Sequence, residues 1–399
     1  MKVIVIGAGP AGLMASAQAS KSGAEVLLLD RNEKPGKKLY ITGKGRCNVT
    51  NDCSPKDFLE SVTTNRKFLY SAIFSFSPEN TIELIENYGT KLKTERGNRV
   101  FPVSDKASDI TKALTKHATD SGVTFASETV LSVEKNSETF TVKTDSAVYE
   151  CDKVIICCGG LSYPTTGSTG DGYEFAKKLG HKIVRLRPAL VPILLKEEVK
   201  SIEGLSLKNV RATILGEQLF GEMLFTANGV SGPIILSLTS ILGEKIKSGV
   251  TLSIDLKPAL DDATLDKRVL GDFDKCKNKC VKNALGDLLP KSLIPYIIAR
   301  WGVNEDRPIN SISREERQKL VKIIKSLDFT IDKLDDIRHA IVTGGGVSTS
   351  EVNPKTMESK IVSGLYFAGE VLDVDALTGG FNIQIALSTG YLAGNGVID

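Results

Sequence analysis

The hydrophobic positions at the start of the chain predict an alternation of strands and a helix. Residues 3–6 are a continuous run of β-branched side chains, which is typical of a strand buried on both faces of a parallel sheet. A helix is predicted from residue 11 to about residue 22, and the apolar run at residues 25–30 predicts the next parallel strand. These three segments together predict a βαβ unit.

Similar elements continue up to about residue 188. Helical periodicity returns at residues 77–88 and 105–121, and these helices are expected to cover the sheet. Alternating segments at residues 124–134 and 139–148 predict paired antiparallel strands, so we expect the sheet to carry a β-meander. Residues 153–158 predict a further buried strand, which ends in two glycines.

The pattern changes in the middle of the chain. Short strand-like pieces at residues 191–195, 210–215 and 251–256 are separated by Gly and Asn turns, which favours a β-rich domain. From residue 261 to about residue 325, charged and apolar positions alternate at helical spacing. We therefore expect residues 189–340 to form an inserted domain that is partly β-sheet and partly helical.

The last part of the chain returns to the pattern of the first. A strand and turn are predicted at residues 364–370, and a final helix at residues 383–394. We therefore predict the α/β class, with a Rossmann-like domain built from residues 1–188 and 341–399 around the insertion.

Composition narrows the range of partners and compartments. Hydrophobic residues make up 41% of the 399 residues and charged residues 25%, as in ordinary globular proteins. The net charge of +3 is small and dispersed, so no nucleic-acid partner is expected. The apolar run at residues 230–242 is too short for a membrane span, so no membrane association is expected. Seven cysteines without a C-x-x-C pair indicate reduced thiols in the cytoplasm, and three scattered histidines predict no metal site.

A glycine motif at the first strand–helix junction points to a dinucleotide. Gly7, Gly9 and Gly12 follow the strand and open the helix, and Asp30 ends the second strand. Gly7 permits the tight turn, Gly9 lets the backbone approach a diphosphate, and Gly12 lets helix and strand pack closely. The helix N-terminus then offers N–H groups to the anion, and Asp30 is expected to accept hydrogen bonds from the ribose.

Four further motifs resemble those of one flavoprotein family. They occupy residues 37–51, 159–170, 353–360 and 377–384. The chain resembles the aminoacetone-oxidase-like flavoproteins, a group that also includes flavoproteins linked to bile-acid dehydroxylation. This resemblance implies an FAD domain made of both chain ends, with a β-barrel and helical insertion that covers the substrate.

The resemblance also implies a set of FAD contacts. They are Ala11, Asp30, Arg31, Lys37, Lys38, Gly43, the backbone of Val130, Gly369, Glu370, Asp373, Asn382 and Ile383. Asp30 departs from the longer Glu that is common at the ribose position.

Three groups of residues add physical arguments to that set. Gly380 precedes the final helix, so the backbone there can lie close to a flat ring. The N-terminus of that helix, at Asn382, would then face the flavin. The alternative is a glycine-rich loop that merely caps the helix. Gly159, after a buried strand, is a further cofactor candidate. Arg46 belongs to a basic cluster with Lys37, Lys38 and Lys44 that either balances the phosphates, attracts an anionic substrate or is simply solvated.

Two further features of the sequence bear on redox chemistry. Cys47 and Cys53 resemble the cysteine pair of flavin disulfide reductases, but their spacing is one residue too long, which favours ordinary thiols. No second glycine motif of this kind appears, so the sequence predicts no dedicated NAD(P)H domain. NAD(P)H, if it serves as reductant, would bind transiently.

Three functions follow as hypotheses. In the first, an FAD-dependent oxidoreductase oxidises a small molecule, and the resemblance implies an amine such as aminoacetone with O2 as acceptor. In the second, NAD(P)H reduces the flavin, which then reduces an activated C=C bond of an enone or steroid-like compound. The third is a flavin-dependent sensor or binding protein without catalysis. No catalytic base is identified from the sequence.

Overall fold

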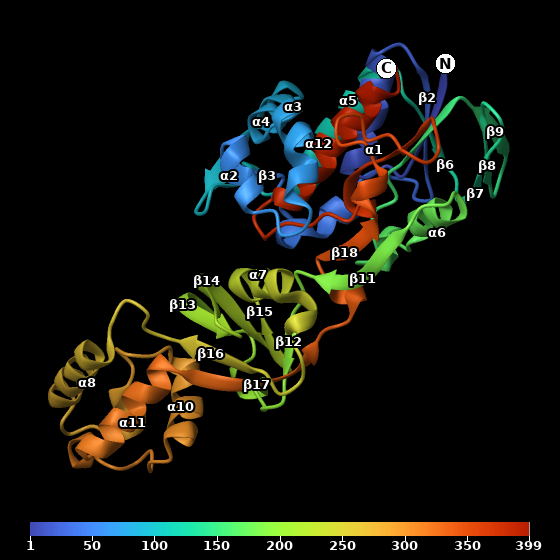
Figure 1. Ribbon diagram of the computed structural model, residues 1–399. Coiled ribbons are helices and arrows are strands. Elements are labelled where there is room, and N and C mark those ends of the chain that lie inside the picture. The colour runs from blue at the N-terminus through green and yellow to red at the C-terminus, as the bar shows by residue number, and fades with distance from the viewer. Residues whose placement is uncertain (399) are drawn as a thin grey trace. The chain divides into compact units, whose positions relative to one another are not determined.

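The computed structural model describes residues 1–398, which form two compact units. One unit contains Met1–Ala189 together with the chain from Ile337 onward, and the other contains Leu190–Asp336 (Figure 1). Assigning the cofactor to the first unit and the substrate to the second stays a prediction.

The first unit is built on a five-stranded sheet in which all neighbouring strands are parallel. The strand order is β19 (Leu365–Phe367), β10 (Lys153–Ile156), β1 (Lys2–Ile6), β2 (Glu25–Asp30) and β6 (Thr124–Ser127). β1 is the central strand, and its four apolar side chains are buried, as the continuous hydrophobic run predicted. The prediction of a Rossmann-like domain from both chain ends is confirmed.

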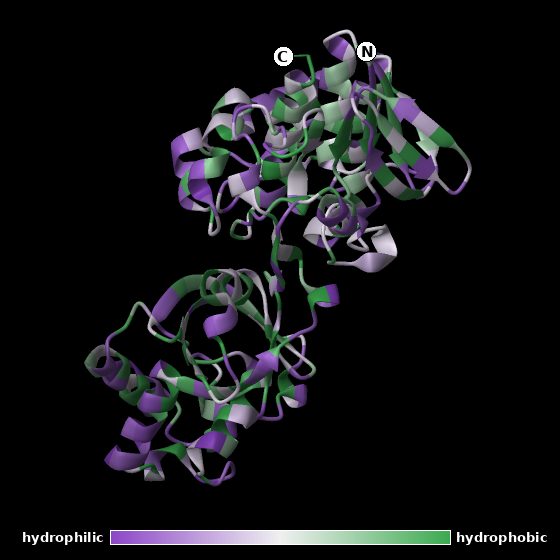
Figure 2. Cartoon of the chain, turned by 45° about the vertical axis from the view of Figure 1, so that its right-hand side comes forward, coloured by the Kyte–Doolittle hydropathy of each residue, from purple (hydrophilic) through white to green (hydrophobic). Residues whose placement is uncertain are grey.

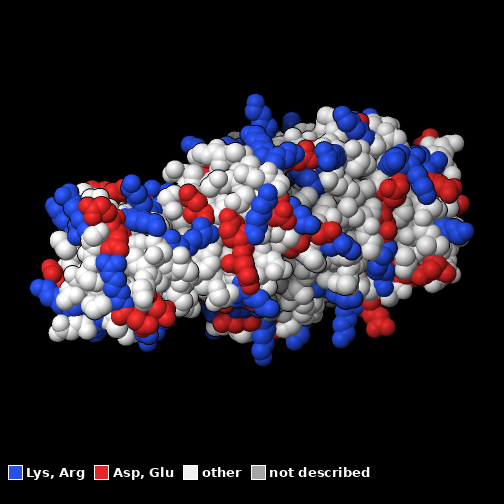
Figure 3. Space-filling model, turned by 90° about the horizontal axis from the view of Figure 1, so that it is seen from below, with Lys and Arg blue, Asp and Glu red and all other residues white. Residues whose placement is uncertain are grey.

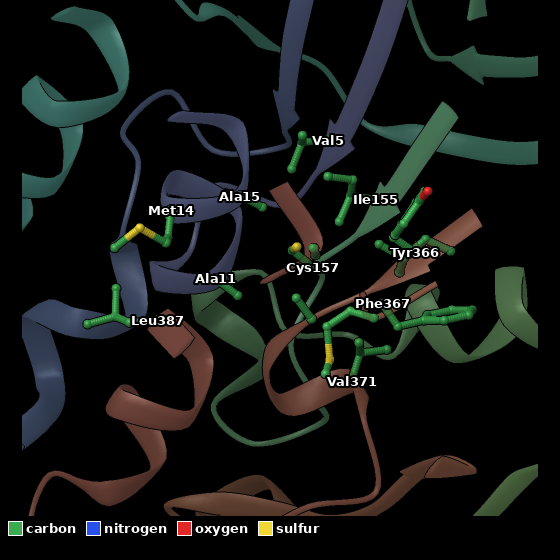
Figure 4. Packing of buried hydrophobic residues seen from close by; sticks show 14 of the residues in the cluster. Val5, Ala11, Met14, Ala15, Ile155, Cys157, Tyr366, Phe367, Val371 and Leu387 are labelled. Carbon is green, nitrogen blue, oxygen red and sulfur yellow. The ribbon is translucent and has the colours of Figure 1, made fainter. Parts of the chain in front are cut away.

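Helices cover the sheet and bring the two ends of the chain together. α1 (Pro10–Lys21) packs on β1 and β2, and both α5 (Ala107–Asp120) and α12 (Phe381–Gly396) pack against α1. Figure 4 shows the apolar contact beneath the glycine turn, where Ala11 and Ala15 lie near Ile155, Cys157 and Val371. Small side chains on α1 therefore let the helix lie close to the strand ends.

The antiparallel strands of this unit differ in one respect from the expectation. β7 (Val130–Lys135), β8 (Phe140–Thr144) and β9 (Val148–Cys151) form the predicted meander. The segment expected as one strand over residues 124–134 is divided, because its first half is β6 of the parallel sheet. The chain turns between the two strands, where Glu128 N–H donates to Asp30 O and Thr129 N–H donates to Asp145 Oδ1.

The remaining elements of this unit are short. They are the 3₁₀ segment η1 (Lys37–Gly45), α2 (Pro55–Glu60), α3 (Tyr70–Ser75), α4 (Pro78–Asn87), α6 (Asp171–Lys178), the strands β3 (Thr50–Asn51), β4 (Leu92–Glu95) and β5 (Arg99–Pro102), and the pair β11 (Ile183–Ala189) and β18 (Val342–Val347). β3, β5 and β4 form a small antiparallel sheet, and β11 pairs with β18.

The second unit contains a closed six-stranded barrel and a helical part. The barrel strands, in spatial order, are β12 (Ile193–Leu195), β15 (Gly229–Ser231), β14 (Glu217–Thr226), β13 (Ser206–Ile214), β16 (Thr251–Asp255) and β17 (Leu327–Leu334). The helices are α7 (Pro233–Leu242), α8 (Asp262–Lys275), α9 (Val281–Ala284), α10 (Ile294–Trp301) and α11 (Arg314–Lys325). The predicted β-barrel and helical insertion is confirmed. Figure 2 shows hydrophilic and hydrophobic residues alternating along these helices.

The surface carries charges of both signs. Figure 3 shows Lys and Arg intermixed with Asp and Glu over the face in view. Within residues 1–398, no helix combines the length and apolar character that a membrane span requires. The same residues contain no group of three or more His, Cys, Asp or Glu side chains placed to hold a metal ion.

Candidate functional site

The glycine turn lies at the carboxyl end of β1 and is packed tightly on two sides. Gly7 has φ 103°, and a Cβ there would lie 2.5 Å from Cys157 O. A Cβ on Gly12 would lie 1.7 Å from Gly7 O, so this position of α1 also excludes a side chain. Both glycines are therefore required for the turn and for helix–strand packing.

Gly9 differs from its two neighbours in the motif. A Cβ on Gly9 would meet no atom within 4 Å, so the backbone here faces open space. Pro10 occupies the first position of α1, and the N–H groups of Ala11 and Gly12 have no partner within the helix by helix geometry. An open backbone at a helix N-terminus fits the diphosphate of a dinucleotide.

Asp30 and Asn32 stand beside the turn. Asp30 Oδ2 accepts from Ala8 N–H at 2.7 Å, and Oδ1 accepts from Asn32 N–H at 2.8 Å and Asn32 Nδ2 at 2.9 Å. Lys37 Nζ donates to Asn32 Oδ1 at 3.1 Å, and Arg31 forms an ion pair with Asp171. Asn32 was missed by the sequence analysis, although it lies next to two predicted contacts. We call Gly7, Gly9, Gly12, Asp30 and Asn32 the nucleotide end.

Lys38 and Glu370, both predicted as cofactor contacts, form one hydrogen-bonded cluster. Lys38 Nζ lies 2.7 Å from Glu370 Oε2 and 2.6 Å from Ser162 Oγ. Glu370 Oε1 accepts from Ser162 Oγ and from Thr343 N–H, both at 2.9 Å. Burial raises the pKa of Glu370, but Lys38 and these hydrogen bonds outweigh burial and leave the pKa below its usual value. Glu370 is therefore an ionised carboxylate at neutral pH.

The cluster depends on glycine at position 160. A Cβ on Gly160 would lie 2.3 Å from Thr343 Oγ1 and 2.8 Å from Glu370 Oε1. The preceding Gly159, a predicted cofactor contact, has φ 72° and lies in the segment that follows β10. Ser162 and Thr343 were not singled out from the sequence. The two glycines before Ser162 were the signal that another group approaches the backbone here.

Motifs from the two ends of the chain meet at the start of α12. Asn51 Nδ2 donates to Gly379 O at 3.2 Å, and Thr50 Oγ1 donates to Gln384 Oε1 at 2.6 Å. Gly380 has φ 95°, and a Cβ there would lie 2.4 Å from Thr50 O. We call Thr50, Asn51, Gly380, Asn382 and Gln384 the ring end.

The side chain and the backbone of Asn382 have separate tasks. Its Oδ1 accepts from Ala376 N–H at 3.0 Å and its Nδ2 donates to Ala376 O at 2.9 Å, so the side chain closes the preceding loop. The N–H groups of Asn382 and Ile383 lie in the first turn of α12 and have no partner within the helix. The backbone of this turn, rather than the Asn382 side chain, is therefore the part that suits a flavin edge.

Two residues before the ring end in the sequence, Asn48 has a polar atom that the fold leaves unsatisfied. Its Oδ1 is buried and has no hydrogen-bond partner in the part of the chain that the structure describes. Gly43, a predicted contact, lies beside it, since a Cβ on Gly43 would be 3.0 Å from Asn48 N. A buried acceptor without a partner is uncommon and fits a donor supplied by a bound group. With the open backbone at Gly9, the residues present fit FAD.

Asp373 lies in the sequence between Glu370 and Gly380. Asn65 Nδ2 donates to Asp373 O at 2.7 Å and to Oδ2 at 2.9 Å. Burial raises the pKa of Asp373 above its ordinary value, although Asn65 and Arg187 oppose the shift. Its neighbour Asp375 is fully buried and pairs with Arg187 at 3.1 Å.

Two predicted residues lie apart from these contacts. Arg46 Nη1 donates to Glu95 Oε1 at 2.8 Å, and its guanidinium lies 4.0 Å from the centre of the Phe101 ring. Its role in binding the cofactor stays a prediction, and in the structure its guanidinium contacts the side chains of Glu95, Asp105 and Phe101. Val130 begins β7, at the edge of the meander.

Cys47 and Cys53 are separate free thiols. Burial raises the pKa of the Cys47 thiol to about 12 and that of Cys53 to about 11. Because a thiolate is the reactive form, these thiols are poorly suited to redox exchange.

Comparison with known proteins adds a family and several relatives. The sequence model described as "HI0933-like protein Rossmann domain" matches residues 1–396. The chain is 33% identical to a ribosomal RNA dihydrouridine synthase of Escherichia coli, over 99% of this chain and 97% of that protein. It is 30% identical to a 3-dehydro-bile acid delta(4,6)-reductase of Clostridium scindens, over 98% of each chain.

A solved structure supports the fold. The 3-ketosteroid-delta4-(5alpha)-dehydrogenase of Rhodococcus jostii superimposes with a TM-score of 0.52 at 15% identity, over 100% of this chain and 96% of that chain.

Proposed function

This chain belongs to the HI0933-like Rossmann-domain family and is an FAD-dependent oxidoreductase, and from that premise we propose that it reduces a carbon–carbon double bond conjugated to a carbonyl group. One observation carries the proposal. The two relatives of 30% and 33% identity are named for reactions that share this chemistry. A delta(4,6)-reductase acts on the C=C bonds of a 3-keto steroid, and dihydrouridine is uridine whose C=C bond beside a carbonyl has been reduced.

The chain supplies binding groups for the cofactor in this proposal. The amides of Ala11 and Gly12 would hold the diphosphate, and Asp30 the ribose. Glu370 and Asp373 would lie along the ribityl chain, and the first turn of α12 would face the ring. FAD, when bound, supplies the hydride, and the protein supplies orientation and electrostatics.

The reaction adds two electrons and two protons to the substrate. NAD(P)H is the proposed reductant; it gives up a hydride and becomes NAD(P)+, while solvent supplies the second proton. The sequence contains no second motif of the Gly7–Gly12 type, so in this proposal NAD(P)H binds transiently rather than on a domain of its own.

The substrate class is testable in two forms. One is a small enone, such as a steroid with a C=C bond conjugated to its 3-keto group. The other is uridine in ribosomal RNA. The small, dispersed net charge predicted no nucleic-acid partner, whereas the name of the E. coli relative supports RNA as the second candidate substrate. The competing direction is oxidation of a small amine such as aminoacetone by O2, and neither of the two relatives above carries such a name.

The experiment follows the flavin of the purified holoenzyme without oxygen. NADH and NADPH are tested for bleaching, and the reduced enzyme is then mixed with 4-androstene-3,17-dione or with ribosomal RNA. We expect reoxidation by one of them, with a product 2 Da heavier by mass spectrometry. Reduction of the flavin by aminoacetone with peroxide formed under air, and no reoxidation by either C=C substrate, would overturn the proposal.

A further inference from the structure

Arg187 lies against a strand from the other end of the chain. It belongs to β11 and is opposite Gly344 of β18. A Cβ on Gly344 would lie 2.6 Å from Arg187 Nη1 and 2.7 Å from Cζ. The guanidinium therefore rests on the bare backbone of Gly344, and a side chain at this position would displace it.

Only one of the two terminal amino groups of Arg187 is used by the fold. Nη2 donates to Thr64 Oγ1 and to Asp375 Oδ1, each at 3.1 Å. Nη1 is buried and has no hydrogen-bond partner among residues 1–398. Leaving a buried donor of a charged group without a hydrogen bond is costly in free energy. The ion pair with Asp375 uses Nη2 and does not require Nη1 to stay unpaired. The amino group Nη1 therefore favours a hydrogen-bond acceptor that residues 1–398 do not supply.

The position of Arg187 connects it to the proposed site. Its partner Asp375 lies in the segment that joins Glu370 to Asn382, both predicted cofactor contacts. Asn382 binds Ala376, next to Asp375. Gly344 follows Thr343, whose N–H donates to Glu370. All of these residues belong to the first unit, so their arrangement does not depend on the position of the second.

We propose that Nη1 of Arg187 donates a hydrogen bond to the carbonyl oxygen of the conjugated substrate. This inference rests on the proposed function. When hydride adds to the carbon β to the carbonyl, a C–H bond forms there and the electrons of the C=C bond move toward the carbonyl oxygen as an enolate. A proton from solvent then adds to the α carbon. A fixed cationic donor stabilises the negative charge on that oxygen, and no base is needed.

Two substitutions change the position of the donor but keep a positively charged partner for the Asp375 carboxylate. Gly344→Ala places a methyl group where Nη1 lies, and the guanidinium can move because it is the end of a flexible side chain. Arg187→Lys keeps a cation for Asp375 but has no second amino group. Arg66→Ala is the control, because Arg66 forms an ion pair with the exposed Glu60.

The measurements separate the cofactor from the substrate. We expect FAD affinity, the flavin spectrum and the rate of reduction by NAD(P)H to stay within about twofold of wild type in all three variants. Reoxidation by the substrate that wild type uses is expected to fall about 100-fold in G344A and R187K, as for the loss of one oxyanion donor. Binding of that substrate to the oxidised enzyme is followed by the change in flavin absorbance. The substrate concentration that gives half of this change should be at least about tenfold higher in G344A and R187K than in wild type.

The outcomes distinguish this inference from the proposed function. Wild-type reoxidation rates in both variants would overturn the role of Arg187 alone. A parallel loss of FAD affinity or an altered flavin spectrum would show that Nη1 serves the cofactor, which also overturns it. If wild type is reoxidised by neither substrate, the proposed function itself fails.

Discussion

The nucleotide end and the ring end of the site are built in different ways. The residues of the nucleotide end lie within one βαβ unit, between Gly7 and Asn32. The ring end joins Thr50 and Asn51 to Gly380 and Gln384, more than 300 positions later in the chain. The first end is a local motif, whereas the second exists only when the two ends of the chain have come together.

This difference predicts different responses to mutation. At the nucleotide end the turn is fixed by its own backbone. A methyl group inserted there therefore either disrupts the fold of the turn or blocks the approach of its ligand. At the ring end the groups hold one another through long-range hydrogen bonds, so a change there acts on the assembly. The Lys38–Glu370 cluster connects residues of both chain ends and lies between these cases.

The largest effect is expected from Gly12→Ala. Its Cβ would lie 1.7 Å from Gly7 O, so the helix must move away from the strand. We expect a loss of at least about 3 kcal/mol in the free energy of unfolding, and a protein without flavin. Urea denaturation and the ratio of flavin to protein absorbance measure both.

Gly9→Ala is the matched comparison at the same turn. Its Cβ meets no protein atom within 4 Å, so the apo protein should unfold within about 0.5 kcal/mol of wild type. FAD affinity should nevertheless fall at least tenfold, because the methyl group would occupy the approach to the diphosphate. Unchanged FAD binding in G9A would show that the diphosphate lies elsewhere.

Next in size is Lys38→Met. Glu370 would keep its bonds to Ser162 and Thr343 but lose its cation at 2.7 Å. Removing one partner of a largely buried pair is expected to cost about 3 kcal/mol at pH 7. The double variant K38M/E370Q should recover most of the loss, because no uncompensated charge remains. Stability of K38M equal to wild type would contradict the importance of this pair.

The same pair predicts a pH dependence. The pKa of Glu370 is lowered in the folded protein, so its contribution to stability is complete above the unfolded value of about 4.3. This contribution is lost as the pH falls through the lowered pKa. The difference in unfolding free energy between wild type and K38M should therefore shrink between pH 5 and pH 3, which urea titrations over that range can follow.

A smaller effect is expected at the ring end from Gln384→Leu. Gln384 is fully buried; its Nε2 donates to Phe76 O at 3.1 Å, and its Oε1 accepts from Thr50. Leaving the Thr50 hydroxyl without an acceptor should cost about 2 kcal/mol. The flavin spectrum should change, while ADP, a ligand for the nucleotide end alone, should bind with unchanged affinity. Ser388→Ala removes the hydrogen bond between Gln384 Nε2 and Ser388 Oγ at 3.0 Å but keeps the Thr50 contact, so it shows which contact of Gln384 matters. An equal loss of ADP affinity would show that the two ends do not act separately.

The contrast between the ends also explains what the sequence could predict. Gly7, Gly9, Gly12 and Asp30 were recognised because their roles follow from spacing within one unit. Ser162, Thr343, Asn65 and Arg187 were missed because each acquires its role from a partner far away in the sequence, and nothing beside it in the chain indicates that partner. The division of residues 124–134 into β6 and β7 was missed for a similar reason, since only pairing with β2 reveals the parallel strand.

Arg46 is the case in which sequence and structure give different expectations, and it carries the smallest predicted effect. Its position in a basic cluster suggested a phosphate contact, whereas the folded chain holds it between Glu95 and Asp105 of the neighbouring segment. Partly exposed ion pairs contribute little, so Arg46→Ala should lower the free energy of unfolding by less than about 1 kcal/mol. FAD affinity, measured by quenching of flavin fluorescence, should stay within about twofold. A tenfold loss would mean that Arg46 leaves these carboxylates when FAD binds, and the nucleotide end would then extend beyond the local motif.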